Sequence, residues 1–222
     1  MPATGYASPM DLKARSHDEV ASRWMFFRQW LRNPLSTAAV SPSSRLLARR
    51  MIAELPPGCR RVIEFGGGTG AITQALLDHG LAPEDVLVVE LNADLYRHLR
   101  GRFPRVPVVH GSAEAIVQLA DESGFSRHGP ADAVVSGLGL LSMPRAVQRS
   151  VLSAAFSVLG PEGCLIQFTY GPVSPVAGDL LSELDLVATR SRLTWWNLPP
   201  ATVWVFTRAT SRSVPAVRSQ LR

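Results

Sequence analysis

Short apolar runs alternate with amphipathic stretches along most of the chain. The apolar runs, rich in valine, leucine and isoleucine, lie at 61–65, 86–90, 106–110, 132–136 and 163–169. Amphipathic stretches that predict helices lie between them at 70–79, 93–101, 113–119 and 144–158. Apolar strands joined by helices are typical of a parallel sheet that is covered on both faces. This rhythm predicts an α/β fold with a doubly wound, mostly parallel sheet.

Two more strand-like segments, 184–196 and 202–208, lie near the C-terminal end of the sequence. Both are rich in valine, threonine and tryptophan, and Pro199 and Pro200 separate them. We expect them to form an antiparallel pair at the edge of the sheet, which brings it to seven strands. No repeat or internal boundary is visible, so we expect one domain over residues 56–210.

Two helices are predicted in an N-terminal extension that covers residues 1–55. The first, at about 16–33, begins at a Ser-x-x-Glu capping box and is stopped by Pro34. The second, at about 42–55, begins at a Ser-Pro pair, a favourable cap and first-turn residue.

The first of these helices combines aromatic and basic side chains. Its candidate membrane-contacting residues are Arg23, Trp24, Phe27, Arg28, Trp30 and Leu31. Such a mixture is typical of an amphipathic helix that lies in a membrane interface. A helix packed on the domain's own core, with its arginines in solvent, is the alternative. The two interpretations are compatible if the helix is a detachable lid.

The turn after the first strand of the domain carries the most informative residues. The acid Glu64 precedes the turn, whose glycines are Gly66, Gly67, Gly68 and Gly70. Glycines allow a tight turn and let a ligand approach the free N–H groups of the next helix. The second strand ends at Glu90, followed by Leu91, and an acid there is suited to binding ribose hydroxyls. These residues predict a nucleoside-cofactor site.

The identity of the cofactor depends on Glu64. Gly66, Gly68 and Ala71 also satisfy the dinucleotide pattern G-x-G-x-x-A, which is a weak signal alone. A carboxylate at position 64 would repel a pyrophosphate, whereas it can face a methionyl ammonium. The form E-x-G-x-G-x-G also matches the first motif of class I methyltransferases. We therefore favour S-adenosylmethionine, with S-adenosylhomocysteine as product, over a dinucleotide or a turn without ligand.

Further candidate site residues lie at the ends of the third, fourth and fifth predicted strands. Class I methyltransferases bind adenine in the loop after the third strand through an acid and a backbone N–H, and here Ser112 and Ala113 occupy these positions. Ser136 ends the fourth strand and is a candidate for cofactor binding and for catalysis, since we expect an exposed hydroxyl there that accepts hydrogen bonds from a substrate nitrogen; a flexible turn is the alternative. Tyr170 ends the fifth strand, where its ring can attract a cationic amine by about 0.5–2 kcal/mol, unless it plugs the edge of the core.

Charge points to an anionic partner. The formal net charge is +5 and the pI is about 10.0. After Asp185 the chain carries six arginines and no acid or lysine, and residues 211–222 are expected to form a basic tail. This asymmetry favours a phospholipid surface or nucleic acid, although a tail that only aids solubility is the alternative.

Other classes of protein are disfavoured by composition. No apolar run reaches the roughly 18–20 residues of a membrane-spanning helix, and the first thirty residues lack a signal peptide's apolar stretch. We therefore expect a cytoplasmic protein. Cys59 and Cys164 are too few for a disulfide framework, and no metal-ligand cluster is visible, so we expect reduced thiols and no metal.

The chain resembles the bacterial phospholipid N-methyltransferases. The matching segments are 27–34, 39–44, 64–70, 89–90, 102–104, 136–138, 167–175 and 197–201. The resemblance implies a Rossmann-like class I enzyme that methylates phosphatidylethanolamine stepwise toward phosphatidylcholine. It further implies an anionic phospholipid membrane surface as partner, on the inner face of the cell membrane, and no nucleic acid. Gly139 departs from the family pattern, which has proline there.

The resemblance leaves the substrate side of the site less defined. Arginines should bind the lipid phosphate, and the candidates are Arg45, Arg190 and Arg192. No histidine or carboxylate base is visible in the motifs, so catalysis would depend on proximity and orientation. The alternative function is an RNA adenine N-methyltransferase or an RNA-binding protein that uses the same basic surface.

Overall fold

The computed structural model describes residues 42–170, 172–191 and 201–209 of the chain. The predicted helix at 16–33, with its candidate membrane-contacting residues, lies outside the described residues, as does the predicted basic tail at 211–222.

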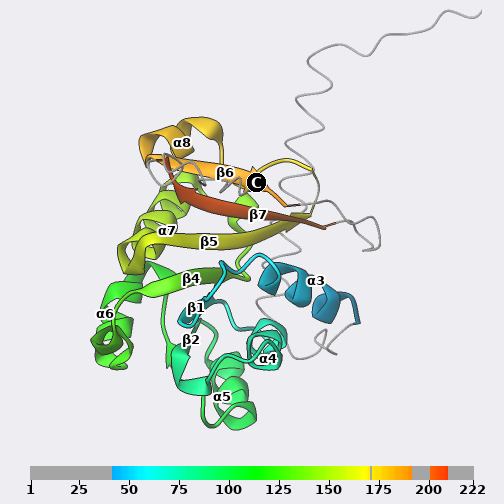
Figure 1. Cartoon of the computed structure of the whole chain (residues 1–222), viewed down its shortest axis with the longest axis vertical. Coiled ribbons are helices and arrows are strands. Elements are labelled where there is room, and N and C mark those ends of the chain that lie inside the picture. Colours follow the sequence, from blue (N-terminus) through cyan, green and yellow to red (C-terminus); the bar gives the residue numbers. More distant parts are fainter. Residues whose placement is uncertain (1–41, 171, 192–200, 210–222) are drawn as a thin grey trace, which may run out of the picture.

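The described residues form a seven-stranded sheet with the order β3-β2-β1-β4-β5-β7-β6 (Figure 1). The strands are β1 (Val62–Phe65), β2 (Val86–Glu90), β3 (Val108–His110), β4 (Ala131–Ser136), β5 (Leu159–Tyr170), β6 (Leu186–Arg190) and β7 (Ala201–Arg208). Strands β1 to β5 pair in parallel, and β7 is antiparallel to both β5 and β6. The doubly wound sheet and its antiparallel edge pair are thus confirmed.

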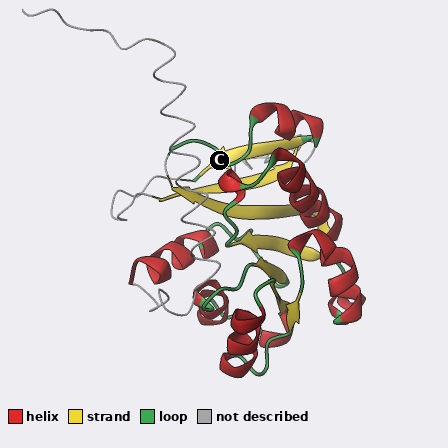
Figure 2. Ribbon diagram, turned by 180° about the vertical axis from the view of Figure 1, so that it is seen from behind, coloured by secondary structure: helices red, strands yellow, loops and turns green. Residues whose placement is uncertain are grey.

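Helices cover both faces of this sheet (Figures 1 and 2). One face carries α6 (Ile116–Glu122), α7 (Arg145–Val158) and α8 (Gly178–Glu183), and the other carries α3 (Pro42–Ile52), α4 (Ala71–Asp78) and α5 (Ala93–Arg102). Short 3-10 turns connect them: η1 (Pro83–Asp85), η2 (Ala113–Ala115), η3 (Phe125–His128) and η4 (Leu140–Ser142). None of the described helices is long and apolar enough to cross a membrane.

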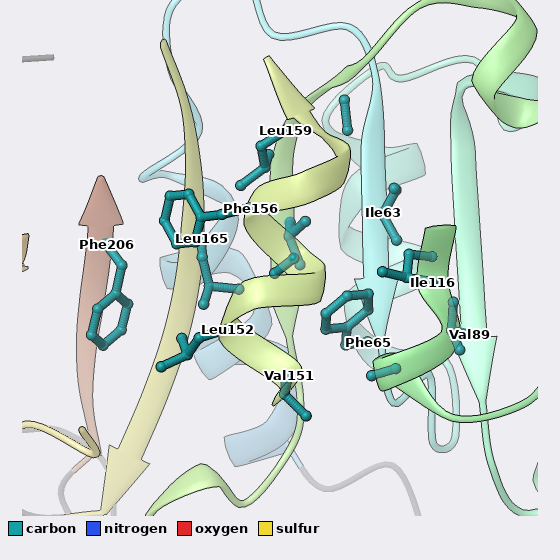
Figure 3. Packing of buried hydrophobic residues seen from close by; sticks show 14 of the residues in the cluster. Ile63, Phe65, Val89, Ile116, Val151, Leu152, Phe156, Leu159, Leu165 and Phe206 are labelled. Carbon is teal, nitrogen blue, oxygen red and sulfur yellow. The ribbon is translucent and has the colours of Figure 1, made fainter. Parts of the chain in front are cut away.

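Successive residues of the strands contribute side chains to two apolar cores, one on each face of the sheet. Ile63 and Phe65 of β1 face the α7 side, where Leu152 of α7 packs into the same cluster (Figure 3). Val62 faces the other side and packs with Met51 of α3. Both faces of the central strands are therefore apolar, which explains the unbroken apolar runs in the sequence. A polar residue within such a strand is correspondingly conspicuous.

Some predicted boundaries differ from the structure, and one helix was missed. Strand β5 begins at Leu159 rather than at 163, because a bulge lets Ala131 pair with Leu159 while Ala133 pairs with Cys164. The helix expected at 113–119 is the turn η2 followed by α6. Helix α8 was not predicted, since it is short and has no side-chain cap that would mark its start.

Candidate functional site

The carboxyl ends of β1, β2 and β4 meet at one point of the sheet. The N–H of Gly66 donates to the carbonyl of Val89 on β2, and the N–H of Gly137 donates to the carbonyl of Phe65, each at 2.8 Å. From β1 the chain continues to β2 and β3 on one side, and the connection from β3 then crosses back to β4 on the other side of β1, which makes this the topological switch point of the sheet. Ligands of doubly wound sheets bind at such a point.

Glu90, at the end of β2, is held in place by backbone donors. Its side chain is buried, Oε2 accepts the N–H of Gly68 and Oε1 accepts the N–H of Asn92, both at 2.8 Å. These bonds orient the carboxylate and tie it to the glycine turn. A carboxylate oxygen accepts more than one hydrogen bond, so both oxygens retain capacity for a pair of ribose hydroxyls. Glu90 therefore fits its predicted role.

Glu64 is the second buried acid of the site. Its Oε2 accepts a hydrogen bond of 2.6 Å from the hydroxyl of Thr73 on α4, whereas Oε1 is buried and has no partner among the described residues. Burial raises the pKa of the Glu64 carboxyl to about 8; Thr73 opposes this shift and the charge of Glu90 adds to it. An ammonium placed at Oε1 would supply the missing donor and favour the ionised form. The site thus fits a cofactor that carries an amino group beside a ribose.

The glycines of the turn serve the packing of the protein as well as the ligand. Gly66, Gly68 and Gly70 have φ of 75°, 55° and 83°, which side-chain-bearing residues rarely adopt. A Cβ on Gly67 would lie 2.5 Å from Cγ1 of Val88, and one on Gly70 would lie 2.4 Å from the Phe103 ring. Two glycines of the motif are therefore required by contacts inside the protein.

The predicted adenine loop is tied to the end of β2. Nε2 of His110 lies 2.9 Å from the carbonyl oxygen of Leu91, and the Leu91 side chain is 65% exposed. The Ser112 hydroxyl accepts the N–H of Glu114 at 3.3 Å and so caps η2. Ala113 is buried in the core. The adenine contact of Ser112 stays a prediction, and its hydroxyl already has one partner.

The end of β4 differs from the prediction. Ser136 is fully buried, and its hydroxyl accepts the N–H of Leu138 at 3.3 Å. The expectation of an exposed Ser136 hydroxyl was wrong, because β4 lies between β1 and β5 and its last residue remains inside the sheet. Tyr170, at the end of β5, is 47% exposed and meets the Phe168 ring edge-on at 5.6 Å between centroids. A tyrosine that plugs the core is therefore the less favoured alternative.

Gln167 is a polar residue of this region that the sequence prediction missed. It is fully buried, and its Nε2 donates to the carbonyls of Leu138 and Phe168 at 2.8 Å each. Its Oε1 is buried without a hydrogen-bond partner in the described part of the chain. The signal in the sequence was a glutamine between the apolar residues Ile166 and Phe168 of the strand.

The candidate phosphate-binding arginines are dispersed. Arg45 is exposed on α3 and Arg190 is exposed at the end of β6, whereas Arg192 lies outside the described residues. Arg208, another of the C-terminal arginines, has a structural role, since it donates to the carbonyls of Gly160 and Phe156 where α7 ends and β5 begins. The described ranges contain no group of three or more metal-ligating side chains.

Comparisons with known proteins agree with this geometry. A family model described as a methyltransferase domain matches residues 62–163. An ornithine lipid N-methyltransferase from Singulisphaera acidiphila is 33% identical over 153 residues, which are 67% of this chain and 78% of that protein. A ribosomal RNA small subunit methyltransferase A from Synechococcus is 36% identical over 91 residues, 40% of this chain but 28% of that protein.

The fold also matches solved structures. The glycopeptide N-methyltransferase MtfA, solved in complex with S-adenosyl-L-methionine, has a TM-score of 0.58 at 15% identity. The match covers 77% of this chain and 96% of that one. At this level of identity the likeness establishes the fold.

Proposed function

The chain belongs to the class I S-adenosylmethionine-dependent lipid N-methyltransferases, and from this premise we propose that it methylates phosphatidylethanolamine and its mono- and dimethyl derivatives, leading to phosphatidylcholine. The family membership makes S-adenosylmethionine the cofactor. The observation that carries the assignment to this site is the unpartnered Oε1 of Glu64 beside the anchored carboxylate of Glu90. The 33% sequence identity to an ornithine lipid N-methyltransferase supports a lipid amine as the acceptor of the methyl group.

The roles of the residues follow from their positions. The bound cofactor supplies an activated methyl group on its sulfonium. Glu90 would hold the ribose, Glu64 the amino group, and Leu91 would present an apolar surface to adenine. Tyr170, at the exposed end of β5, would attract the approaching lipid amine through its ring face.

The substrate amine must lose a proton before it attacks the methyl carbon. The loops after β4 and β5, at 137–143 and 172–177, contain no histidine, aspartate or glutamate. The proton would therefore leave to water or to the lipid phosphate, and the enzyme would contribute proximity and orientation.

We further infer that the enzyme binds peripherally to the inner face of the cell membrane. Exposed large apolar side chains support this location: Leu46, Leu91, Val117, Leu141, Tyr170 and Val173. Three of these residues, Leu91, Leu141 and Val173, lie in loops that follow β2, β4 and β5. Apolar groups near the site entrance would contact the lipid that supplies the amine.

A methyl-transfer assay tests the substrate. Labelled S-adenosylmethionine is incubated with vesicles that contain phosphatidylethanolamine, its mono- or dimethyl form, or ornithine lipid, and in parallel with RNA. We expect labelled phosphatidylethanolamine derivatives with the wild type and none with the Glu90→Ala variant. Label only in ornithine lipid, or only in RNA, contradicts the proposed substrate.

Vesicle co-sedimentation tests the location. Deleting residues 1–33 should release the enzyme from anionic vesicles at low salt while S-adenosylhomocysteine binding persists, because the described cofactor residues all lie beyond residue 61. Equal sedimentation of the full-length and shortened proteins would contradict a membrane-binding role for the helix predicted at 16–33.

A further inference from the structure

Four polar side chains form a row across neighbouring strands. In the pairing registers Ser136 of β4 lies opposite Gln167 of β5, Gln167 opposite Trp204 of β7, and Trp204 opposite Arg190 of β6. Residues directly opposite one another on paired strands point to the same side of a sheet. Trp204 packs against the core on the α7 side, which places the row on that face. The row is therefore one continuous feature built from four strands.

Two members of the row carry buried polar atoms without a partner. Within the described ranges neither Oε1 of Gln167 nor Nε1 of Trp204 makes a hydrogen bond. The orientation of the Gln167 amide is settled, because its Nε2 faces two carbonyl oxygens at 2.8 Å. The open atom of Gln167 is thus an acceptor, and that of Trp204 is a donor. Buried polar groups are rarely left unpaired, so each atom indicates a missing partner.

We propose that this row is the headgroup site of the lipid substrate. Oε1 of Gln167 accepts a hydrogen bond from the substrate amine, while the Trp204 indole N–H and the Arg190 guanidinium bind the anion of the same headgroup. The ligand is a zwitterionic lipid whose amine lies a few bonds from a phosphate or a carboxylate. This inference rests on the proposed function and defines the substrate side of the same site.

The order of the row agrees with the chemistry. Ser136 also pairs with Phe65 of β1, next to the glycine turn, so the acceptor Gln167 lies on the cofactor side and the cation Arg190 on the far side. Neighbouring strands are about 4.8 Å apart, so Gln167 and Arg190 are separated by roughly 10 Å at the backbone, a distance that their side chains can shorten. An amine bound at Gln167 is thereby directed toward the methyl donor.

Solvent exposure decreases along the row from Arg190 to Gln167. Arg190 is exposed, Trp204 is half-buried and Gln167 is fully buried. An anionic group first meets Arg190, and the amine reaches Gln167 only when the side chains that cover it shift. The same residue holds the Leu138 carbonyl, so Gln167 also links the headgroup to the loop after β4.

Steady-state kinetics with two acceptors test the row. The acceptors are short-chain phosphatidylethanolamine, which has amine and anion, and a long-chain primary alkylamine, which has the amine alone. Trp204→Phe and Arg190→Gln should raise KM for the phospholipid by about tenfold and leave KM for the alkylamine unchanged. Gln167→Met should impair both acceptors. Arg97→Gln, which removes an exposed arginine of α5, is the control and should change neither.

These measurements distinguish failure of the proposed function from failure of the proposed headgroup site. Wild-type enzyme that does not methylate phosphatidylethanolamine refutes the proposed function, whereas wild type that methylates it, with unchanged KM in Trp204→Phe and Arg190→Gln, refutes the row. In that second case the open atoms bind only water. Unchanged binding of S-adenosylhomocysteine and unchanged thermal unfolding are expected for both variants; a parallel loss of stability and of turnover with both acceptors would indicate a merely structural role. Repeating the assay with ornithine lipid shows whether the anion site takes phosphate, carboxylate or both.

Discussion

Buried polar side chains lie in two regions: at the ends of β1 and β2, and at the ends of β4 and β5 with the part of β7 that pairs with them. Their hydrogen-bonding groups are satisfied differently in the two regions. In the first region, the cofactor half, both oxygens of Glu90 already accept backbone N–H groups. In the second, the substrate half, Gln167 and Trp204 each leave one buried polar atom without a partner among the described residues. In the cofactor half Oε1 of Glu64 is also open among the described residues, so both halves retain buried atoms that await a ligand, but only in the cofactor half does the backbone hold a neighbouring carboxylate in place.

The two halves also differ in what their glycines do. Gly67 and Gly70 in the cofactor half are enclosed by side chains of β2 and of the α5 region. Gly137 in the substrate half approaches the backbone of the cofactor half, since its Cβ would lie 2.8 Å from the carbonyl oxygen of Gly66. A side chain added at Gly67 or Gly70 should therefore disturb packing within the cofactor half, whereas one added at Gly137 should disturb the contact between the two halves.

The largest effect is expected for Glu90→Ala. Removing this carboxylate deletes the acceptor for the ribose and releases two backbone N–H groups of the turn. Affinity for S-adenosylhomocysteine should fall by about 2–4 kcal/mol, measured by calorimetry. Glu84→Ala, at the other end of β2, removes an exposed acid and should leave affinity unchanged. Unchanged affinity in Glu90→Ala would refute the cofactor site at β2.

Gly67→Ala should lower the stability of the protein itself. The added methyl group would meet Val88 and Leu99 at 2.5 and 2.7 Å, so the free energy of unfolding should fall by about 1–3 kcal/mol in urea titrations. Gly101→Ala is the matched control, because its Cβ meets nothing within 4 Å and it lies in helix α5. That control should be neutral or stabilising by up to about 1 kcal/mol. Weaker cofactor binding at normal stability would instead assign Gly67 to the ligand.

Glu64 should make cofactor binding depend on pH. Its pKa of about 8 in the folded protein exceeds the ordinary value of 4.5, so it is mostly protonated at pH 7, while a cationic amino group binds the ionised form. Affinity for S-adenosylhomocysteine should therefore rise about fivefold between pH 7 and pH 8, measured by calorimetry. In Glu64→Gln this rise should be much smaller. The same rise in both proteins would show that another group titrates.

Glu64 also links stability to pH in the absence of cofactor. Because the folded pKa is raised, the stabilising contribution of the protonated carboxyl is fully present below about pH 4.5 and is lost as the pH rises through 8. Thermal unfolding of the wild type should lose more stability over this range than that of Glu64→Gln.

The smallest effect is expected at Tyr170, in the substrate half. Tyr170→Ala should lower methyl transfer about two- to fivefold, since a cation–π contact at an exposed site contributes about 0.5–1 kcal/mol. Tyr170→Phe should retain activity. Glu162→Gln, which changes an exposed residue near the opposite end of β5, is the control and should leave activity unchanged. Both Tyr170 variants should bind S-adenosylhomocysteine normally. If Tyr170→Ala loses turnover and melting temperature together, the ring belongs to the core.

Much of the cofactor half is predictable from the sequence because its signals are local. The alternation of apolar runs and amphipathic stretches specifies the parallel sheet, since strand and helix periodicities act over a few residues. Glu64, the glycines and Glu90 lie at the ends of consecutive strands, and the βαβ connection places those ends side by side. The sequence alone therefore determined the fold class and the predicted cofactor site.

The tertiary structure decided what depends on pairing between distant segments. The burial of Ser136 follows from the position of β4 between β1 and β5, and the packing role of Gly67 follows from the approach of α5 to the turn. Gln167, Trp204 and Arg190 come together because β7 inserts between β5 and β6 in one particular register. A shift of β7 by one residue would turn the Trp204 side chain to the other face, and no local pattern of residues specifies this register.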